Sequence, residues 1–174
     1  MTADRDDQQS EQRTDITHLD EKGRARMVDV SAKEVTERTA KAQACVAMKK
    51  ETLDLILKAG IKKGDVLAVA RVAGIMAAKN TSDLIPMCHP ISIAAVNMDF
   101  EIDKENAIIT AVVTTKTRDR TGIEMEALTG AAVAALTIYD MCKGVDRSIT
   151  ITDIQLLEKT GGRSGTYARG ENKR

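Results

Sequence analysis

Asp140 and Lys143 lie three residues apart in the largely apolar stretch LTIYDMCKGVD, residues 136–146. On a helix, positions i and i+3 share a face, so this spacing places a carboxylate beside an ammonium group. Such a pair can fasten a helix end, where a lysine also favours the negative end of the helix dipole. It can equally handle protons, because ionisable groups with apolar neighbours tend to have shifted pKa values and to lie at functional sites. The two residues alone leave both interpretations open.

Two further carboxylates, Glu124 and Glu126, occur in the segment TGIEME. Thr121 and Glu124 have the spacing of a capping box, which gives Glu124 a structural task, and Glu126 suits a first helical turn. A basic stretch directly precedes them. Carboxylates beside cations are suited to acid–base catalysis, and equally to an ordinary solvated helix start.

His89 lies between two prolines in the segment PMCHP, and the only other histidine is His18, near the N-terminus. Because proline fixes the backbone, the loop is predicted to be rigid. A rigid loop histidine is suited to proton transfer or to hydrogen bonding a phosphate, although a structural role is as common. Cys88 is adjacent, but no second pair of metal-ligand residues occurs, which argues against a metal site.

Several cations occur in turns and glycine-rich segments. Lys63 precedes a predicted helix, whose N-terminal N–H groups attract anions. Lys159 and Arg163 flank two glycines in KTGGRSG, the composition of a phosphate-binding loop. The spacing is not that of a Walker A motif, and a disordered tail would have a similar composition.

These residues need a scaffold that brings helix ends and loops together. Asp65 is a predicted N-cap. The order of elements is β-α-(α)-β-β-α-β, typical of the split β-α-β, ferredoxin-like α+β fold with an antiparallel sheet covered by helices. Hydrophobic spacing predicts a short strand at 26–30, a long helix at 35–57 after a capping box at 31–34, a helix at 66–79, a hairpin of strands at 91–103 and 106–117, a helix at 120–143 and a strand at 148–159.

The chain has 174 residues, with 26 basic and 26 acidic side chains and no tryptophan. Balanced charge argues against general affinity for nucleic acid or membranes, and the shortage of aromatic side chains argues against base stacking. Three cysteines without CxxC spacing argue against disulfides and indicate the cytoplasm. We expect a disordered leader at residues 1–16, a single domain at 17–166 and a flexible tail at 167–174.

Six segments together resemble the cyclic pyranopterin monophosphate synthase family, the C protein of molybdenum cofactor biosynthesis. The resemblance spans about residues 17–166. The segments are MVDVSAK, KKGDVLAVARVAGI, SDLIPMCHP, TGIEMEALT, ALTIYDMCK and LLEKTGGRSG.

This resemblance implies a ferredoxin-like fold and a hexamer built as a trimer of dimers, with active sites at subunit interfaces. It implies a reaction that converts (8S)-3′,8-cyclo-7,8-dihydroguanosine 5′-triphosphate to cyclic pyranopterin monophosphate and releases pyrophosphate. No cofactor and no metal ion held by the protein are expected.

The resemblance also implies roles for particular residues. Asp140, Lys143 and Lys63 would be the general acids and bases. The resemblance therefore favours a catalytic role for the pair Asp140 and Lys143 over a salt bridge that only fastens the helix end. The substrate would be bound by Met87, Cys88, His89, Glu124, Met125, Glu126, Lys159, Arg163, Lys79 and Arg38. Arg163 stands where relatives carry lysine, which keeps the charge but changes the donor geometry.

The alternative from another class is a non-catalytic, regulatory module that binds GTP or a pterin on the same fold. Such a module would need the basic loops but not the two glutamates together with Asp140 and Lys143. Release of pyrophosphate on adding substrate distinguishes the two.

Overall fold

The computed structural model describes residue 24, residues 26–163 and residues 165–170. The predicted leader at residues 1–16 lies outside this part of the chain. The elements, in chain order, are β1 (Thr36–Ala47), α1 (Lys50–Leu57), α2 (Val66–Lys79), α3 (Thr81–Leu84), β2 (Ile93–Asp103), β3 (Ile108–Asp119), α4 (Glu124–Cys142), β4 (Thr150–Thr160) and β5 (Tyr167–Ala168).

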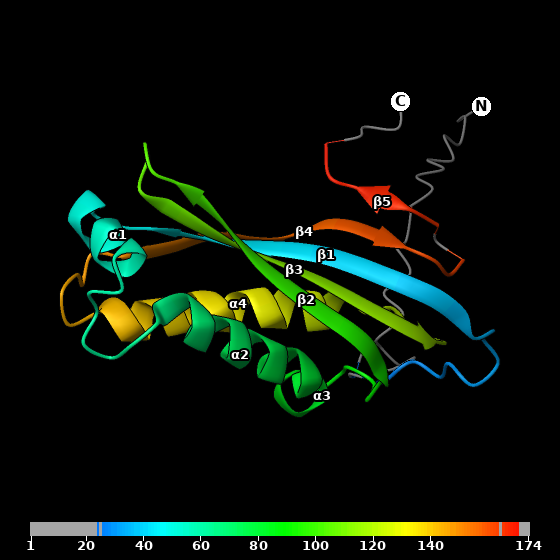
Figure 1. The fold of residues 1–174 in the computed structure, drawn as a ribbon. Helices are drawn as coiled ribbons and strands as arrows, with labels where there is room; N and C mark the ends of the chain where they lie inside the picture. The colour runs from blue at the N-terminus through cyan, green and yellow to red at the C-terminus, as the bar shows by residue number, and fades with distance from the viewer. Residues whose placement is uncertain (1–23, 25, 164, 171–174) are drawn as a thin grey trace, which may run out of the picture.

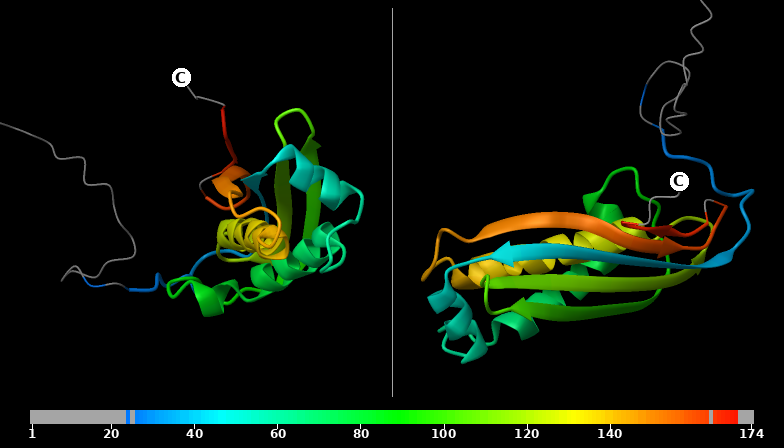
Figure 2. Two further views of the ribbon diagram at one scale, coloured as in Figure 1. Left: turned by 90° about the vertical axis from the view of Figure 1, so that its left-hand side faces the viewer. Right: turned by 90° about the horizontal axis from the view of Figure 1, so that it is seen from above.

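The strands form one sheet in the order β2-β3-β1-β4-β5, and every neighbouring pair is antiparallel. Helices α2 and α4 cover one face of the sheet (Figure 1). Seen from above the view of Figure 1, the strands lie in front of both helices, as the right-hand view of Figure 2 shows. The predicted ferredoxin-like α+β fold is therefore confirmed.

The first strand, β1, replaces most of the helix predicted for residues 35–57, so that prediction is wrong. From Ala40 to Val46 every second side chain is buried, the period of a strand and not of a helix. The buried positions are mostly alanine, which favours helices intrinsically. Pairing with β3 along one edge and with β4 along the other overrides this preference. Helix appears only at α1.

The region before β1 also differs from the prediction, because residues 26–30 contain no strand. Ser31, predicted to start a helix, instead donates its backbone N–H to a carboxylate oxygen of Asp29 at 2.8 Å. This is a local turn of the kind that aspartate favours. Residues 26–33 therefore reach β1 as an irregular segment.

The other predicted elements are confirmed. The carboxylate of Asp65 accepts the N–H of Ala68 at 3.0 Å, as an N-cap residue should, and α2 ends at Lys79. In the β2–β3 turn, Asp103 accepts the N–H groups of Glu105 and Asn106. The helix predicted at 120–143 is α4, and the strand predicted at 148–159 is β4.

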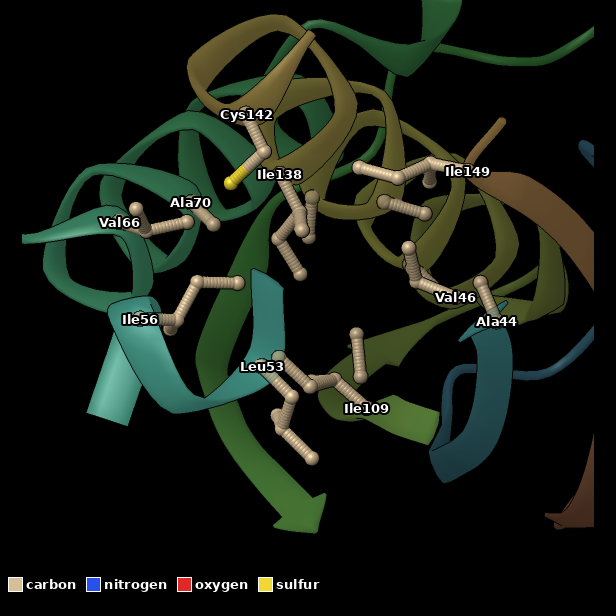
Figure 3. Close-up of a cluster of buried hydrophobic side chains, with 14 of the residues drawn as sticks. Ala44, Val46, Leu53, Ile56, Val66, Ala70, Ile109, Ile138, Cys142 and Ile149 are labelled. Carbon is tan, nitrogen blue, oxygen red and sulfur yellow. The ribbon is translucent and has the colours of Figure 1, made fainter. Parts of the chain in front are cut away.

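The core at one end of the sheet is enclosed by α1, α2 and α4. Figure 3 shows Leu53 and Ile56 of α1 in the same cluster as Val66 of α2 and Ile138 of α4. The loop between α4 and β4 contributes Asp146 to this end of the molecule, where its side chain is buried with 1% exposure. Its carboxylate accepts hydrogen bonds at 2.6–3.0 Å from groups of three residues, namely Lys49, Thr52 and Ser148.

The last strand, β5, was not predicted: residues 167 and 168, at the start of the expected flexible tail, pair with Glu158 and Lys159 of β4. Residues 171–174 lie outside the described part of the chain. Among the described residues, no helix combines the length and the apolar character needed to cross a membrane.

Candidate functional site

A cavity of about 630 Å³ opens where the start of α4 meets the end of β4. The irregular segment before β1 and the loop after α3 complete its walls. Eight of the ten predicted substrate-binding residues line this cavity, which we call the α4 pocket. They are Arg38, Met87, Cys88, His89, Glu124, Met125, Glu126 and Lys159.

The two glutamates of the α4 pocket differ in their exposure. The Glu124 side chain is 29% exposed, whereas Glu126 is only 4% exposed. Burial, together with the neighbouring charge of Glu124, raises the pKa of Glu126 to about 6. A carboxyl group with this pKa can both give and accept a proton near neutral pH.

The predicted capping box at Thr121 is not formed, because α4 has Ile123 as its N-cap and no side chain caps it. Glu124 instead forms an ion pair with Lys159, with 3.6 Å between Nζ and Oε1. The carboxylate of Glu124 lies so close to Gly122 that a β-carbon there would overlap it. Glu124 is therefore a pocket residue with a defined position.

The imidazole of His89 lies 2.8 Å, through Nε2, from the carbonyl oxygen of Val28. A carbonyl can only accept a hydrogen bond, so this nitrogen carries the proton. The contact ties the histidine loop to the irregular segment before β1. Burial raises the pKa of the neighbouring Cys88 thiol, and the charge of Glu126 adds to this shift, so the thiol stays protonated.

Arg38 is fixed by the main chain. Its guanidinium donates to the carbonyl oxygens of Asp119 and Arg120, both at 3.1 Å. Gly162, with a φ of 72°, passes so close to this guanidinium that a side chain would clash with it. The glycine-rich segment therefore allows the backbone to approach Arg38.

The other two predicted binding residues lie outside the α4 pocket. Arg163 lines a neighbouring cavity of about 610 Å³, whose wall also includes Arg38 and Lys33. Lys79, at the end of α2, lines a separate cavity of about 320 Å³ next to β2. Substrate binding by Lys79 stays a prediction.

Asp140, Lys143 and Lys63 form a second cluster, which we call the α4 C-terminal triad. The Nζ atoms of Lys143 and Lys63 lie 2.5 and 3.1 Å from the two carboxylate oxygens of Asp140. Hydrogen bonds from Lys143 and then Lys63 lower the pKa of Asp140, and Asp140 raises the pKa of Lys143. All three side chains are about half exposed.

The triad and the α4 pocket lie at opposite ends of one helix. Asp140 comes sixteen positions after Glu124, which corresponds to about 24 Å along α4. Figure 1 shows α4 running straight beneath the sheet, from the α3 end to the α1 end. The two groups cannot act on one small molecule within a single chain.

The structure adds pocket residues that the sequence analysis did not select. Lys33 and Arg120 line the α4 pocket, and Arg120 donates through Nε to the carbonyl oxygen of Lys33 at 3.1 Å. Arg120 belongs to the basic stretch before the TGIEME segment, so its position gave a signal. Nothing in the sequence pointed to Lys33, because its segment was predicted to start a helix.

In the described part of the chain, no group of three or more His, Cys, Asp or Glu side chains is arranged to hold a metal ion.

Comparison with known proteins finds a family model that spans the residues of the α4 pocket and the triad, and relatives that match most of the chain. The family model described as the MoaC family matches residues 27–162. Proteins named cyclic pyranopterin monophosphate synthase are 58% identical in Peptoclostridium acidaminophilum, over 89% of this chain and 98% of that protein, and 57% identical in Parvibaculum lavamentivorans, over 87% and 95%. A protein of Mycobacterium bovis named cyclic pyranopterin monophosphate synthase 3 is 60% identical, over 88% of this chain and 86% of that protein.

Proposed function

The chain belongs to the MoaC family, and from this membership we propose that it is a cyclic pyranopterin monophosphate synthase of molybdenum cofactor biosynthesis. The proposed substrate is (8S)-3′,8-cyclo-7,8-dihydroguanosine 5′-triphosphate. The ring system is rearranged to a pterin, a sugar-derived hydroxyl closes a cyclic phosphate on the α-phosphorus, and pyrophosphate leaves.

The observation that carries the proposal is the separation of the α4 pocket from the α4 C-terminal triad. Both groups have the side chains that the reaction needs, yet about 24 Å of helix lies between them. A second subunit that lays its triad against the pocket of the first would complete the site. We therefore propose a homo-oligomer, a hexamer built as a trimer of dimers, with active sites at subunit interfaces.

In this site the α4 pocket binds the substrate. Its cations attract the triphosphate, and Arg163, which lines the neighbouring cavity, stabilises the departing pyrophosphate. Glu124 and Glu126 hydrogen-bond the guanine-derived edge. The Nε2–H group of His89 is a donor for a phosphate oxygen once it leaves Val28.

The triad of the other subunit moves protons. Asp140 is the proposed principal base or acid, and Lys143 and Lys63 hold it ionised in the resting protein. Closure of the interface removes water from around these half-exposed groups, which makes their ionisation more sensitive to the substrate. Each lysine can then return a proton to a ring nitrogen.

The setting of this activity is part of the proposal. Three free cysteines in the described part of the chain agree with a reducing compartment, and we propose the cytoplasm. Neither nucleic acid nor a membrane is a proposed partner. The alternative, a regulatory module that binds GTP or a pterin without turnover, does not require the triad.

Turnover of purified protein tests the proposal. The cyclic dihydro-GTP substrate is added, and pyrophosphate and cyclic pyranopterin monophosphate are measured. We expect the wild-type protein to form both, and Asp140→Asn and Lys143→Ala each to lower kcat at least about 100-fold, as loss of an acid–base group does. Substantial turnover by these variants would remove the triad from catalysis. Binding without pyrophosphate release by the wild type would favour the regulatory module.

A further inference from the structure

The ion pair between Lys159 and Glu124 joins two walls of the α4 pocket. Lys159 belongs to β4 and Glu124 begins α4, so the pair spans from the sheet to the helix. The two side chains are only 20% and 29% exposed. Because solvent screens such a pair less than a surface pair, a change in the charge or the partners of one side chain alters the electrostatic attraction that holds the other.

The position of Glu124 in this pair depends on Gly122. A β-carbon at residue 122 would overlap the carboxylate of Glu124, which supplies its three nearest atoms. The backbone of Gly122 does not need a positive φ, so alanine would fit the main chain. The absence of a side chain at this residue thus leaves room for Glu124 beside Lys159.

Lys159 lies among cations that suit a polyphosphate. Arg38 and Lys33 line the same cavity, and the neighbouring cavity adds Arg163. A phosphate group carries more negative charge than a carboxylate and offers three acceptor oxygens. Where both can reach one ammonium group, the phosphate therefore competes well with the carboxylate.

We infer that the Lys159–Glu124 ion pair is a latch that the phosphate groups of the incoming substrate displace, so that Glu124 is released only when phosphate occupies Lys159. The inference rests on the proposed function for the identity of the substrate, but it requires only a polyphosphate ligand. Before binding, Lys159 neutralises the charge of Glu124 and holds its carboxylate away from the place that the substrate's ring system will occupy. After binding, Glu124 is free to hydrogen-bond the guanine-derived edge beside Glu126.

Calorimetric titration of the full-length protein with inorganic tripolyphosphate tests the latch, because this probe contains no ring for Glu124 to bind. Glu124→Gln should tighten tripolyphosphate binding roughly three- to tenfold, since the competing charge is gone. Gly122→Ala should also tighten it, because it displaces the carboxylate without removing any charge. Lys159→Met should weaken it.

The matched controls separate the latch from general electrostatics. In the Lys159→Met background, the gain from Gly122→Ala should disappear, and the gain from Glu124→Gln should fall to the smaller gain that loss of one pocket charge gives by itself. Glu126→Gln removes a charge from the same pocket without touching the pair, and its smaller gain should persist in that background. Thermal unfolding of each variant verifies that it is folded.

Unchanged affinity in Glu124→Gln and Gly122→Ala would overturn the latch, as would full gains without Lys159 or no tripolyphosphate binding by any of the proteins. Failure of the proposed function has a different signature. A wild type that does not turn over the cyclic dihydro-GTP substrate, while both variants still bind tripolyphosphate more tightly, would keep the latch and reject the synthase.

Discussion

The carboxyl group of Glu126 lies almost entirely out of contact with solvent, next to a second carboxylate and a thiol. The ionised form of Glu126 does not stabilise the folded protein, since burial and the charge of Glu124 both disfavour ionisation. Its folded pKa of about 6 lies above its ordinary value of 4.5. Stability is therefore lost as pH rises through this interval, the reverse of what a salt-bridged carboxylate shows.

Glu126→Gln should accordingly stabilise the protein at pH 7.5, by on the order of 2 kcal/mol, because an amide avoids the cost of a buried charge. At pH 4.5 the gain should nearly vanish, since folded Glu126 is then protonated. Chemical denaturation of both proteins at the two pH values measures the difference. Equal stability of the variant and the wild type at pH 7.5 would show that ionised Glu126 does not destabilise the folded protein.

Asp146 illustrates the opposite case. Hydrogen bonds, led by those from Ser148 and the backbone of Lys49, hold its pKa far below the usual range. This stabilisation is present above the unfolded pKa near 4 and is lost as pH falls below it. The carboxylate ties the loop after α4 to the start of α1.

Asp146→Asn should lower the free energy of unfolding by about 2–4 kcal/mol at pH 7, because buried donors lose a charged acceptor. The difference from the wild type should shrink below about pH 4. Asp54→Asn, on the exposed side of α1, is the matched control and should change stability by less than about 0.5 kcal/mol. A pH-independent loss in Asp146→Asn would contradict the charged hydrogen-bond network.

Among the elements, α2 and α4 approach each other at two glycines. A β-carbon on Gly74 would lie 2.8 Å from the carbonyl oxygen of Gly130 and would overlap the side chain of Met98. Backbone atoms cannot move aside as a flexible side chain can. This contact therefore fixes the spacing of the two helices that cover the sheet.

Gly74→Ala should lower the free energy of unfolding by about 1–3 kcal/mol, because the helices must separate to admit the methyl group. Gly144→Ala is the control, since nothing lies within 4 Å of a β-carbon there and its φ is not positive. Urea denaturation measures both. Equal stabilities of the two variants would mean that the crossing tolerates a wider spacing.

The elements also show what a sequence can reveal locally. Helix α2 was predictable because Asp65, a capping residue, precedes an alanine-rich run with helical hydrophobic spacing that ends in Lys79. Strand β1 was not, because its buried side chains are mostly alanine and the partly buried ones between them, such as Lys41 and Gln43, are also compatible with a helix. Its identity comes from two neighbouring strands that lie far away in sequence, at β3 and β4.

On the scale of the whole molecule, the motifs predicted which residues gather but not where they gather. The segments around His89 and Glu124 lie together in the α4 pocket, as a shared substrate site requires. Asp140 was assigned to the same site, although the helix predicted at 120–143 already placed Glu124 and Asp140 near its opposite ends. Spacing along a sequence does not say which subunit a residue serves.

The surface of the single chain agrees with the proposed assembly. Leu136 on α4 and Val72 and Met76 on α2 are 57–58% exposed. Isolated exposed apolar side chains are common, but these lie on α4, which carries pocket and triad residues, and on α2, which packs against it. Contact between subunits along these helices would bury them and complete the site.

Mixed subunits test the composite site most directly. His89→Ala disables the α4 pocket and Asp140→Asn disables the triad, so each variant alone should be inactive. Co-expressed with two different affinity tags and purified through both, the mixture should regain about one quarter of the wild-type rate, because a random interface has a one-half chance of an intact pocket and a one-half chance of an intact triad. A mixed oligomer that remains inactive, while both variants are folded and assembled, would contradict a site shared between subunits.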